Sequence, residues 1–480
     1  MQMIMEHLII PMLLTYGMSS LASGIQPVNT WAGGTIYIRA DGNVDPETAP
    51  ISSVDNITYT FTDNITGDAS GIAVERDNIV VDGAGYSILG IFTTDSRGIC
   101  LLGRSNVTIR NMEISGWSLG IVFESSSNSC ISGSNVTDNA WIGVYISHSS
   151  NNTISRNTIR GNRDGSKLVS SSNRNSILGN DITENGDHGV WLQHSSNNII
   201  SENNITDNRA GIGAAVAMGP SSSDNVISAN NITNNRRQGI YVEGSSNNNT
   251  LLGNEIALND VAGIELMSSS IYNSIIGNKL ANNSDGVRLY SSNNTVSGNN
   301  ITNCRAAGIA CEWSSNYNTV YRNNLLNNWQ GVWLPTHNNR FYHNNFLNNT
   351  NQVSVPSSGY QRGPNSWDNG CEGNYWSDYG VIDNSTPCDG IGDAPYIIDE
   401  NNQDNCPLMN PHWNPCDINH DLKVNIKDVA TAAVAFGSSP NHPKWNPHAD
   451  ITGEEHFVPD GRIDIGDIAT VALHFGEVDP

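Results

Sequence analysis

Apolar and polar residues alternate in a short phrase that recurs along most of the chain. Each copy opens with a glycine and places an apolar residue at every second position, as in "GVYISHSS" and "GVWLQHSS". This alternation predicts β-strands with one buried side, and the Asn, Ser and Gly residues after each copy predict turns. The opening glycines are Gly120, Gly143, Gly189, Gly239, Gly263, Gly286, Gly308 and Gly331, and weaker copies open at Gly165 and Gly213.

The spacing of these copies is nearly constant, with 22 to 26 residues from one opening glycine to the next. A second phrase lies between them, as in "NTISRNTIRGN" and "NVISANNITNN", so each unit holds three short alternating runs. A fixed period of this length predicts a solenoid. Three strands per unit predict an all-β fold, a right-handed parallel β-helix of about ten or more rungs. We expect Ile, Val and Leu to fill its interior and the repeated Asn residues to stack as hydrogen-bonded ladders at the bends.

The two ends of the chain depart from the repeat. An apolar run from Leu8 to Leu21, followed by small residues, resembles a secretory signal peptide, and a buried N-terminal strand or helix is the alternative. No later run approaches the ~20 apolar residues of a transmembrane helix. We therefore expect a secreted or surface-attached protein without a membrane span. The expected segments are a signal peptide at 1–24, an N-terminal cap with the first rungs at 33–95, repeats at 96–355, a closing segment at 356–412 and a separate module at 413–480.

Charge and cysteine content narrow the class of protein. The formal net charge is −24 although only 15% of the residues are charged. A negative surface repels phosphate backbones, so nucleic acid is not expected as a partner. Four of the eight cysteines lie between Cys371 and Cys416, where a secreted chain is expected to form disulfides of undetermined pairing.

Phrases at both ends of the repeat region resemble a known group of proteins. "GTIYIRADGNVDP" and "ERDNIVVDGAGYSILG" precede the repeats, and "NSWDNGCEGNYWSDYG" follows them. Between Gly34 and Pro411 the chain is similar to secreted parallel β-helix proteins of the NosD and carbohydrate-binding or sugar-hydrolase kind. The resemblance implies the scaffold and leaves the activity open, because this scaffold carries lyases, hydrolases, epimerases, binding modules and inert fibres.

The last segment contains two Asp-rich loops, each followed by an apolar helical pattern. Their oxygen-bearing residues follow the ligand spacing of an EF-hand-type Ca²⁺ loop, although Leu422 replaces the usual glycine and the second loop carries six extra residues. The pair resembles a type I dockerin, which implies Ca²⁺-dependent folding and a cohesin-like partner; a solvated acidic tail is the alternative. The expected ligands are Asp417, Asn419, Asp421, Lys423, Asn425 and Asp428 in the first loop, and Asp450, Thr452, Asp460, Arg462, Asp464 and Asp467 in the second.

The opening phrases also predict the outer face of one sheet. The residue after each glycine points inward and the next points outward, so outward residues of successive rungs form columns. Aromatic and charged side chains in such columns suit polysaccharide, since aromatic rings pack on sugars while polar neighbours bind hydroxyl groups. The expected substrate-binding residues are Trp191, Tyr241, Glu243, Arg163, Arg237, Arg288, Tyr290 and Trp333.

One rung of this face carries small residues. Gly213, Ala215 and Ala217 predict a notch between Trp191 and Tyr241. The preceding turns should gather Arg163, Arg237 and the catalytic candidates Asp164, Asp187 and His188 beside this notch. There His188 would carry a proton, a carboxylate would orient it, and an arginine would hold a uronate. The alternative is that outward positions of a solenoid are polar without forming a site.

These observations leave three functions open. The first is a protein that binds polysaccharide and processes it as a lyase or glycoside hydrolase, attached through the Ca²⁺ module. The second is a structural or adhesive solenoid without enzymatic activity. The third is a NosD-type copper-delivery protein, against which the spacing of His148 and His194 argues, because equivalent positions two rungs apart are separated by ~10 Å.

Overall fold

The computed structural model describes residues 30–208, 214–356, 363–381, 383, 390–412, 416, 418, 424–440, 442–446, 449–451 and 461–473. Several sequence predictions lie outside these residues and stay predictions. They are the signal peptide at 1–24, the disulfide candidate Cys388, and the Ca²⁺ ligands Asp417, Asn419, Asp421, Lys423, Thr452 and Asp460.

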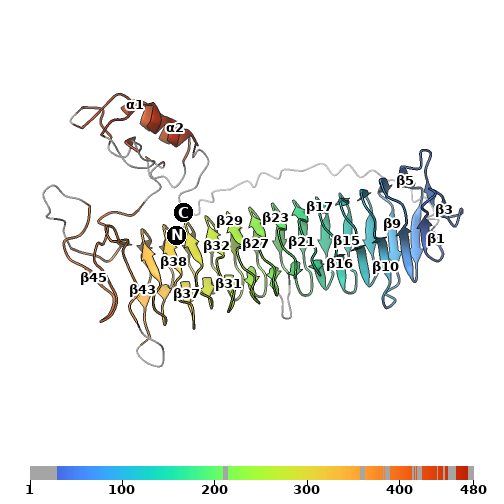
Figure 1. Cartoon of the computed structure of the whole chain (residues 1–480), viewed down its shortest axis with the longest axis horizontal. Helices are drawn as coiled ribbons and strands as arrows, with labels where there is room; N and C mark the ends of the chain where they lie inside the picture. Colours follow the sequence, from blue (N-terminus) through green and yellow to red (C-terminus); the bar gives the residue numbers. More distant parts are fainter. Residues whose placement is uncertain are drawn as a thin grey trace, which may run out of the picture.

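Short strands stack into three long sheets that run along an elongated solenoid (Figure 1). The first sheet contains, in spatial order, β1 (Thr30–Ala32), β6 (Asn64–Gly67), β9 (Ser87–Gly90), β12 (Glu113–Ser115), β15 (Asn135–Thr137), β18 (Thr158–Arg160), β21 (Asp181–Thr183), β24 (Asn204–Thr206), β27 (Asn231–Thr233), β30 (Glu255–Ala257), β33 (Lys279–Ala281), β36 (Asn300–Thr302), β39 (Asn324–Leu326), β42 (Asn345–Leu347) and β44 (Tyr375–Trp376).

The second sheet carries the opening phrases of the repeat. It contains β3 (Val44–Asp45), β2 (Ile36–Ile38), β7 (Ser70–Val74), β10 (Arg97–Leu102), β13 (Leu119–Glu124), β16 (Ile142–Ser147), β19 (Asp164–Val169), β22 (Val190–Gln193), β25 (Val216–Met218), β28 (Ile240–Val242), β31 (Ala262–Leu266), β34 (Asp285–Leu289), β37 (Ala307–Cys311), β40 (Gln330–Trp333) and β43 (Asn351–Ser354).

The third sheet completes each turn of the solenoid. It contains β4 (Ile51–Ser52), β5 (Thr58–Phe61), β8 (Ile79–Asp82), β11 (Val107–Arg110), β14 (Cys130–Ser132), β17 (Thr153–Ser155), β20 (Ser176–Leu178), β23 (Ile199–Ser201), β26 (Val226–Ser228), β29 (Thr250–Leu252), β32 (Ser274–Ile276), β35 (Thr295–Ser297), β38 (Thr319–Tyr321) and β41 (Arg340–Tyr342).

In each turn the chain passes through the third, the first and then the second sheet, and the strands of successive turns pair in parallel. In the described part of the chain, three pairs of strands are antiparallel. They are β2–β3 and β4–β5 at one end, and β45 (Tyr396–Ile397) with β46 (Gln403–Asp404) near the other. The predicted three-strand parallel solenoid is therefore confirmed.

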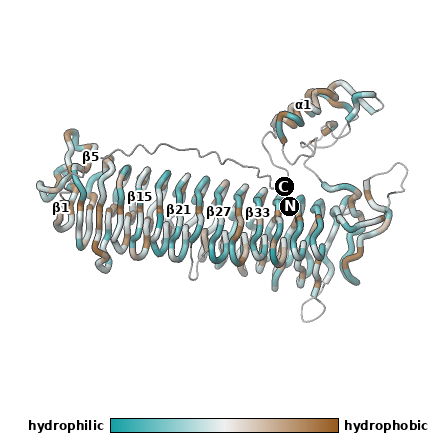
Figure 2. The backbone as a smooth tube through the Cα atoms, turned by 180° about the vertical axis from the view of Figure 1, so that it is seen from behind, coloured by the Kyte–Doolittle hydropathy of each residue, from teal (hydrophilic) through white to brown (hydrophobic). Residues whose placement is uncertain are grey.

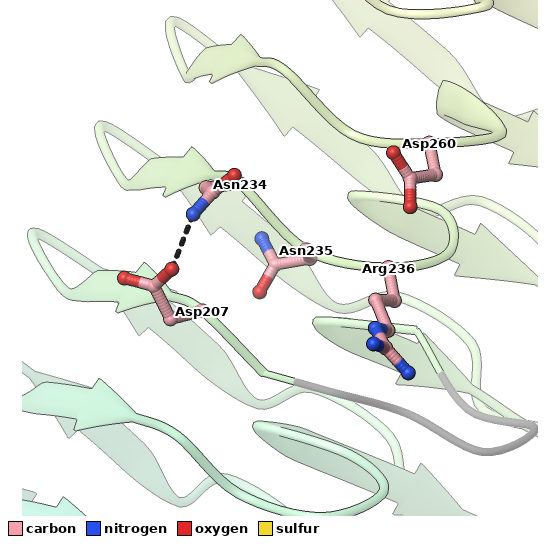
Figure 3. A pocket seen from close by; sticks show the side chains of 5 residues that line it. All are labelled: Asp207, Asn234, Asn235, Arg236 and Asp260. Carbon is pink, nitrogen blue, oxygen red and sulfur yellow. Dashed lines mark hydrogen bonds between the residues drawn. The ribbon is translucent and has the colours of Figure 1, made fainter.

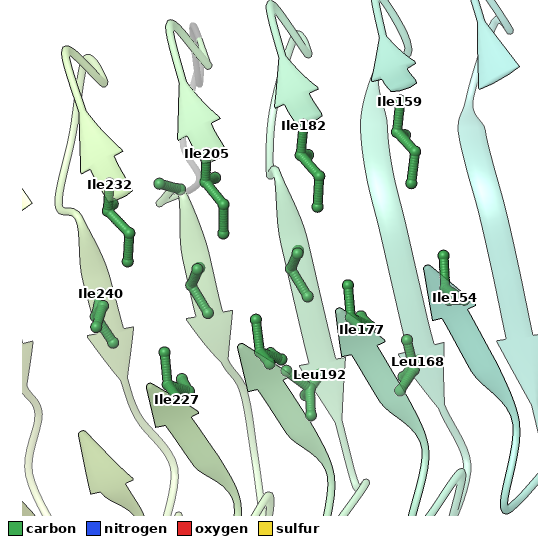
Figure 4. Packing of buried hydrophobic residues seen from close by; sticks show 14 of the residues in the cluster. Ile154, Ile159, Leu168, Ile177, Ile182, Leu192, Ile205, Ile227, Ile232 and Ile240 are labelled. Atoms are coloured by element: carbon green, nitrogen blue, oxygen red, sulfur yellow. The ribbon is translucent and has the colours of Figure 1, made fainter. Parts of the chain in front are cut away.

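The interior is filled by columns of apolar side chains, one from each sheet per turn. Ile177, Ile182 and Leu192 supply one such layer and are almost completely buried (Figure 4). Each turn alternates hydrophobic and hydrophilic positions, as the colours of Figure 2 show. This matches the period-two pattern of the sequence, in which every second residue of a strand faces the core.

Aromatic rings close the interior at its far end. Trp376 stacks on Phe346 with ring centroids 4.1 Å apart, and Tyr396 stacks on Trp376 at the same distance. Trp367 stacks on Phe341 at 4.5 Å. These large rings cover apolar surface that another turn would otherwise cover, which is the role of a terminal cap in a repeat protein.

An asparagine ladder runs along each of the three corners, as the sequence predicts. Asn180, between the third and first sheets, shows the pattern. Its backbone N–H and its Nδ2 both donate to Oδ1 of Asn203 at 2.9 Å, and its own Oδ1 accepts from the N and Nδ2 of Asn157. Its Nδ2 also donates to Ile154 O at 2.9 Å. Equivalent bonds link Asn152, Asn175 and Asn198 at the second-to-third corner, and Asn162, Asn185 and Asn208 at the first-to-second corner.

The glycine column of the second sheet has a steric cause. A Cβ at Gly165 would lie 2.5 Å from the carbonyl oxygen of Gly189 in the next turn. The prediction of an opening residue at Gly213 is wrong, because Ala215 takes this place: Val190 N donates to Ala215 O at 2.9 Å, and Ala215 N donates to Gln238 O at 3.0 Å. The extra residues of this turn thus precede the strand rather than follow it.

A separate helical module follows the solenoid. It contains α1 (Ile426–Ala435) and α2 (Ile465–Leu473), as the apolar patterns after the two Asp-rich loops predict. Its own small core includes Val424, Ala432, Ile463 and Val471. Within the described residues, no helix is long and apolar enough to cross a lipid bilayer.

Candidate functional site

The outer face of the second sheet carries the predicted column of aromatic and charged residues. Strand register confirms every described position except one. Trp191 lies beside Lys167 on one side and beside Ala217 on the other, so Ala217 replaces the expected Ala215. The reason is the two-residue shift of this turn. The column is Val122, Tyr145, Lys167, Trp191, Ala217, Tyr241, Glu265, Arg288, Ala310 and Trp333.

The expected notch is not open. Ala217 is buried, and so is Gly219, which takes the second outward position instead of Ala217. A Cβ on Gly219 would lie 3.0 Å from Nε1 of Trp191. The indole of Trp191 therefore extends along the solenoid axis over the small rung, and the small residues make room for this ring.

A hydrogen-bonded carboxylate–imidazole pair lies at the edge of this face. Asp164 begins β19, and His188 lies in the same column one turn later, just before β22. Asp164 Oδ1 accepts from the backbone N of His188 at 3.1 Å and lies 2.9 Å from its Nδ1. Asp164 is 5% exposed. A neutral His188 that donates from Nδ1 to this carboxylate carries an acceptor nitrogen at Nε2, the arrangement of an oriented general base.

Trp191 connects this pair to a cation. Its ring stacks on His188 with centroids 4.5 Å apart, and Lys167 Nζ lies 3.7 Å from the ring centroid. Burial lowers the pKa of Lys167, and the nearby Arg163 lowers it further, whereas Asp164 raises it. The indole thus has an ammonium group and an imidazole at contact distance, which orders all three side chains.

Arg163 and Asp187 complete the cluster. Arg163 Nε lies 3.8 Å from Asp187 Oδ2, and its guanidinium lies 4.7 Å from the ring centroid of Trp141. Asp187 Oδ1 lies 4.0 Å from Nδ1 of His188. The structure thus brings Arg163, Asp164, Asp187 and His188 together beside Trp191, whereas Arg237 lies outside this cluster. One ligand atom from each of Asp164, Asp187 and His188 lies within 4.8 Å of the others, but the short Asp164–His188 contact makes this a hydrogen-bonded group first.

Two members of the cluster were not predicted as site residues. Lys167 is in the predicted column, but the sequence does not show that its side chain folds onto Trp191. Trp141 precedes β16 and is 52% exposed. The carbonyl oxygen of Trp141 accepts a hydrogen bond from Asp164 N at 2.8 Å. Extending the sequence alignment of this corner by the preceding turn would therefore have placed Trp141 next to Arg163. Arg237 lies on the same corner two turns from Asp187, ~10 Å along the axis.

A second charged group lies further along the face, around Arg288. Its guanidinium bonds to Asp285, and its Nη1 lies 3.7 Å from Oε2 of Glu265. Gln238 Nε2 donates to the same Glu265 oxygen at 3.0 Å. Arg288, an expected substrate-binding residue, is therefore paired with two carboxylates of its own face.

Tyrosines and acids continue the face toward β40. Tyr241 donates from its hydroxyl to Glu243 at 3.1 Å, and burial raises the pKa of this tyrosine. Burial also raises the pKa of Tyr290 and of Glu312, and Trp333 donates a hydrogen bond to Glu312. Of the predicted substrate-binding residues beyond the Trp191 cluster, Tyr241, Glu243, Arg288, Tyr290 and Trp333 thus lie on this face, and Arg237 lies on its corner.

A polar pocket of about 330 Å³ opens on the first-to-second corner, beyond the Trp191 rung (Figure 3). Asn234 Nδ2 donates to Asp207 across its edge. The lining residues are Asp207, Asn234, Asn235, Arg236 and Asp260. This lining is acidic and amide-rich, and it extends the polar edge of the second-sheet face by two turns.

The helical module places two acidic residues in equivalent positions. Asn425 caps α1 and accepts from Lys427 N at 2.9 Å, while Asp428 accepts from Asn425 N at 2.8 Å. Before α2, Asp467 accepts from Asp464 N and from Ile451 N, both at 2.7 Å. Asp428 and Asp467 are fully buried.

The described donors of this module fit a hard cation. Asp450, which is 6% exposed, accepts from Gly461 N at 2.9 Å. Carboxylate oxygens are the donors that Ca²⁺ prefers, so Asp428, Asp450 and Asp467 are candidate ligands. Arg462, an expected ligand of the second loop, is exposed.

Comparisons with known proteins agree with the resemblance that the sequence indicated. The family model described as right handed beta helix region matches residues 97–256, and the model described as periplasmic copper-binding protein (NosD) matches residues 215–337. No curated protein matches the chain.

Several solved structures are similar to this chain at low sequence identity. The A-module of a mannuronan C-5 epimerase from Azotobacter vinelandii is 13% identical, with 69% of this chain and 90% of that chain covered and a TM-score of 0.44. The Dettilon tailspike protein is 16% identical, with 67% and 68% covered and a TM-score of 0.39. A periplasmic alginate epimerase is 13% identical, with 68% and 82% covered and a TM-score of 0.34.

Proposed function

We propose that the protein binds polysaccharide outside the cytoplasm, along the outer face of the second sheet between β19 and β40. The observation that carries this proposal is the ordered group of Trp191, His188 and Lys167. The imidazole stacks on the indole and the ammonium group lies over its ring, so the three side chains together present fixed aromatic and polar atoms to a sugar ring with its hydroxyl groups.

The rest of the face extends this platform. Rungs are spaced by ~4.8 Å, close to the advance of one sugar ring in an extended chain. Tyr241 and Trp333 therefore lie in the same column as Trp191 at whole numbers of rungs, with Glu243 and Glu312 beside them. Arg288 is paired with two carboxylates, whereas Lys167 and Arg163 each lie over an aromatic ring.

The Trp191→Ala variant tests this proposal. We expect it to weaken binding by about tenfold or more, because a stacked ring at the centre of a contact contributes ~1–2 kcal/mol. The measurement is isothermal titration calorimetry of the full chain against a panel of neutral and uronate polysaccharides.

The matched control is Ile199→Ala, an exposed residue of the third sheet in the following turn. It should leave the affinity unchanged. Equal affinity of the Trp191→Ala variant and the wild type for every polysaccharide that binds would contradict the proposal. Lack of binding to every polysaccharide of the panel would favour the structural or adhesive solenoid instead.

A second candidate function is processing of the bound chain by proton transfer. The Asp164–His188 pair supports it, because a carboxylate on Nδ1 leaves Nε2 to take a proton. On a uronate, His188 would take the C5 proton, the C5–H electron pair would form the C4=C5 double bond, and the glycosidic oxygen would leave C4 with its electron pair and take a proton from water. New unsaturated ends would identify elimination, whereas new reducing ends alone would identify hydrolysis. His188→Gln should stop either reaction while keeping the affinity for the chain.

We also propose that residues 413–480 form a dockerin-like Ca²⁺ module that attaches the solenoid to a cohesin-like partner. If so, Ca²⁺ should raise the thermal midpoint of this module by several degrees, because a ligand that binds only the folded state stabilises it. Differential scanning calorimetry of the full chain with Ca²⁺ and with a chelator measures this shift. Asp467→Ala should abolish the Ca²⁺-dependent shift, whereas Asp399→Ala, on the solenoid cap, should keep it.

A further inference from the structure

The corner between the second and third sheets carries an alternating column of tyrosine and asparagine. The column runs through Asn248, Tyr272, Asn293, Tyr317 and Asn338, one residue per turn. All five have a positive φ, between 56° and 60°. Earlier in the solenoid the same place in the bend is occupied mostly by asparagine or aspartate, at Asn106, Asn128, Asn151, Asn197 and Asp224.

Tyrosine is a poor choice for this backbone position. The left-handed region disfavours residues with a bulky side chain, whereas asparagine and aspartate tolerate it. The side chains of Tyr272 and Tyr317 are 60% and 61% exposed, so burial of their rings offsets little of this conformational free energy. Packing of the solenoid therefore does not explain either tyrosine. A residue type that disfavours the backbone conformation it must adopt, without a compensating contact, indicates a functional role.

The surroundings of the two rings point to a ligand class. Tyr272 and Tyr317 are two turns apart, ~10 Å along the axis. Asn338 Nδ2 donates to the hydroxyl of Tyr317 at 3.2 Å, and Trp313, in the same turn as Tyr317, is 64% exposed. The bends at 267–274, 291–297, 313–321 and 334–339 contain no Asp, Glu, Lys or Arg. Aromatic rings and amides without charge suit an uncharged chain of sugars.

We propose that this corner is a second binding site, for a neutral polysaccharide chain that lies parallel to the solenoid axis. Tyr272 and Tyr317 stack on every second sugar ring, which is the spacing at which a β-1,4-linked chain repeats its orientation. Asn293, between the two rings, and Asn338 bond to sugar hydroxyls. The site is separate from the charged face around Trp191, and it shares with the proposed function only the class of ligand.

The double variant Tyr272→Asn with Tyr317→Asn tests the site. Affinity for cellohexaose, measured by calorimetry on the full chain, should fall by at least about tenfold, because two stacking rings are lost. The thermal midpoint should stay the same or rise, because asparagine suits the left-handed backbone better than tyrosine does. A loss of binding together with unchanged or higher stability is not the result that a purely structural role predicts.

Two comparisons decide between this site and the second-sheet face. Trp191→Ala should keep the affinity for cellohexaose, and the tyrosine double variant should keep the affinity for polygalacturonate or any other polymer that depends on Trp191. Unchanged cellohexaose affinity in the tyrosine variant would overturn the corner site and leave the proposed function standing. Absence of cellohexaose binding by the wild type would also overturn it. Loss of cellohexaose binding only in Trp191→Ala would assign the neutral chain to the second-sheet face.

Discussion

Replacing Asn180 by alanine is expected to lower the free energy of unfolding of the solenoid by about 3–5 kcal/mol. The side chain is 2% exposed and takes part in bonds to the turns before and after its own. Without it, the backbone N and Nδ2 of Asn157 lose their acceptor, and Ile154 O loses a donor. These groups are buried, so water does not replace the missing partner. Each unpaired group then destabilises the folded state by its free energy of desolvation.

Urea unfolding followed by tryptophan fluorescence measures this loss. The matched control is Asn197→Gly, at an exposed bend residue with a φ of 58°. Glycine adopts this backbone freely, so the control should change stability by less than about 0.5 kcal/mol. A loss of similar size in both variants would mean that the ladder bonds contribute no more than any other asparagine of the bend.

The second large effect is expected at Asp404, where the same ladder ends. Asp404 Oδ2 accepts from Asn374 N at 2.7 Å and from Trp376 Nε1 at 3.0 Å, and Oδ1 accepts from Cys406 N at 3.1 Å. Asp404→Ala leaves these N–H groups without their carboxylate in a closed cap, so we expect a loss of about 3–5 kcal/mol in the same urea experiment. Asp404→Asn keeps one oxygen for Asn374 and Trp376 and should lose much less. Equal losses would contradict this account.

The ionisation of Asp404 gives this prediction a pH dependence. Burial raises the pKa of Asp404 from its ordinary 3.8 to about 6, although four N–H groups donate to the carboxylate. The folded chain therefore binds this proton more tightly than the unfolded chain. The contribution is complete below pH 4 and is lost as the pH rises through 6, about 3 kcal/mol in total. The stability advantage of the wild type over Asp404→Asn should shrink over that range and stay constant above it.

The solenoid could be predicted from the sequence because each turn repeats the same local choices. Alternation fixes which side chains face inward, and the ladder asparagines fix where the chain bends. The prediction failed only where one turn carries extra residues. The sequence pattern predicts Gly213 as the opening residue of this turn, because glycine takes that place in the other copies. The structure places Ala215 there, which shows that an alanine can occupy this column in a turn of unusual length.

The candidate site was predictable as a set of neighbours but not as a set of conformations. Column alignment places Asp164 beside His188, and their hydrogen bond follows from that proximity. The orientation of the Trp191 indole over Gly219 depends on its side-chain rotamer, which the repeat pattern does not predict. The pairing of Arg288 with two carboxylates also depends on rotamers. The column predicts that opposite charges lie nearby, but not which of them form ion pairs.

The direction of the asparagine ladders has a consequence for the length of the molecule. Every amide in the Asn180 ladder accepts from the preceding turn and donates to the following one, so an inserted turn with the same asparagine would meet compatible groups on both sides. Duplication of one complete turn should lengthen the rod by ~4.8 Å and leave both caps unchanged. Each turn thus adds a constant length, and the distance between the two ends of the solenoid can be set by the number of duplicated turns alone.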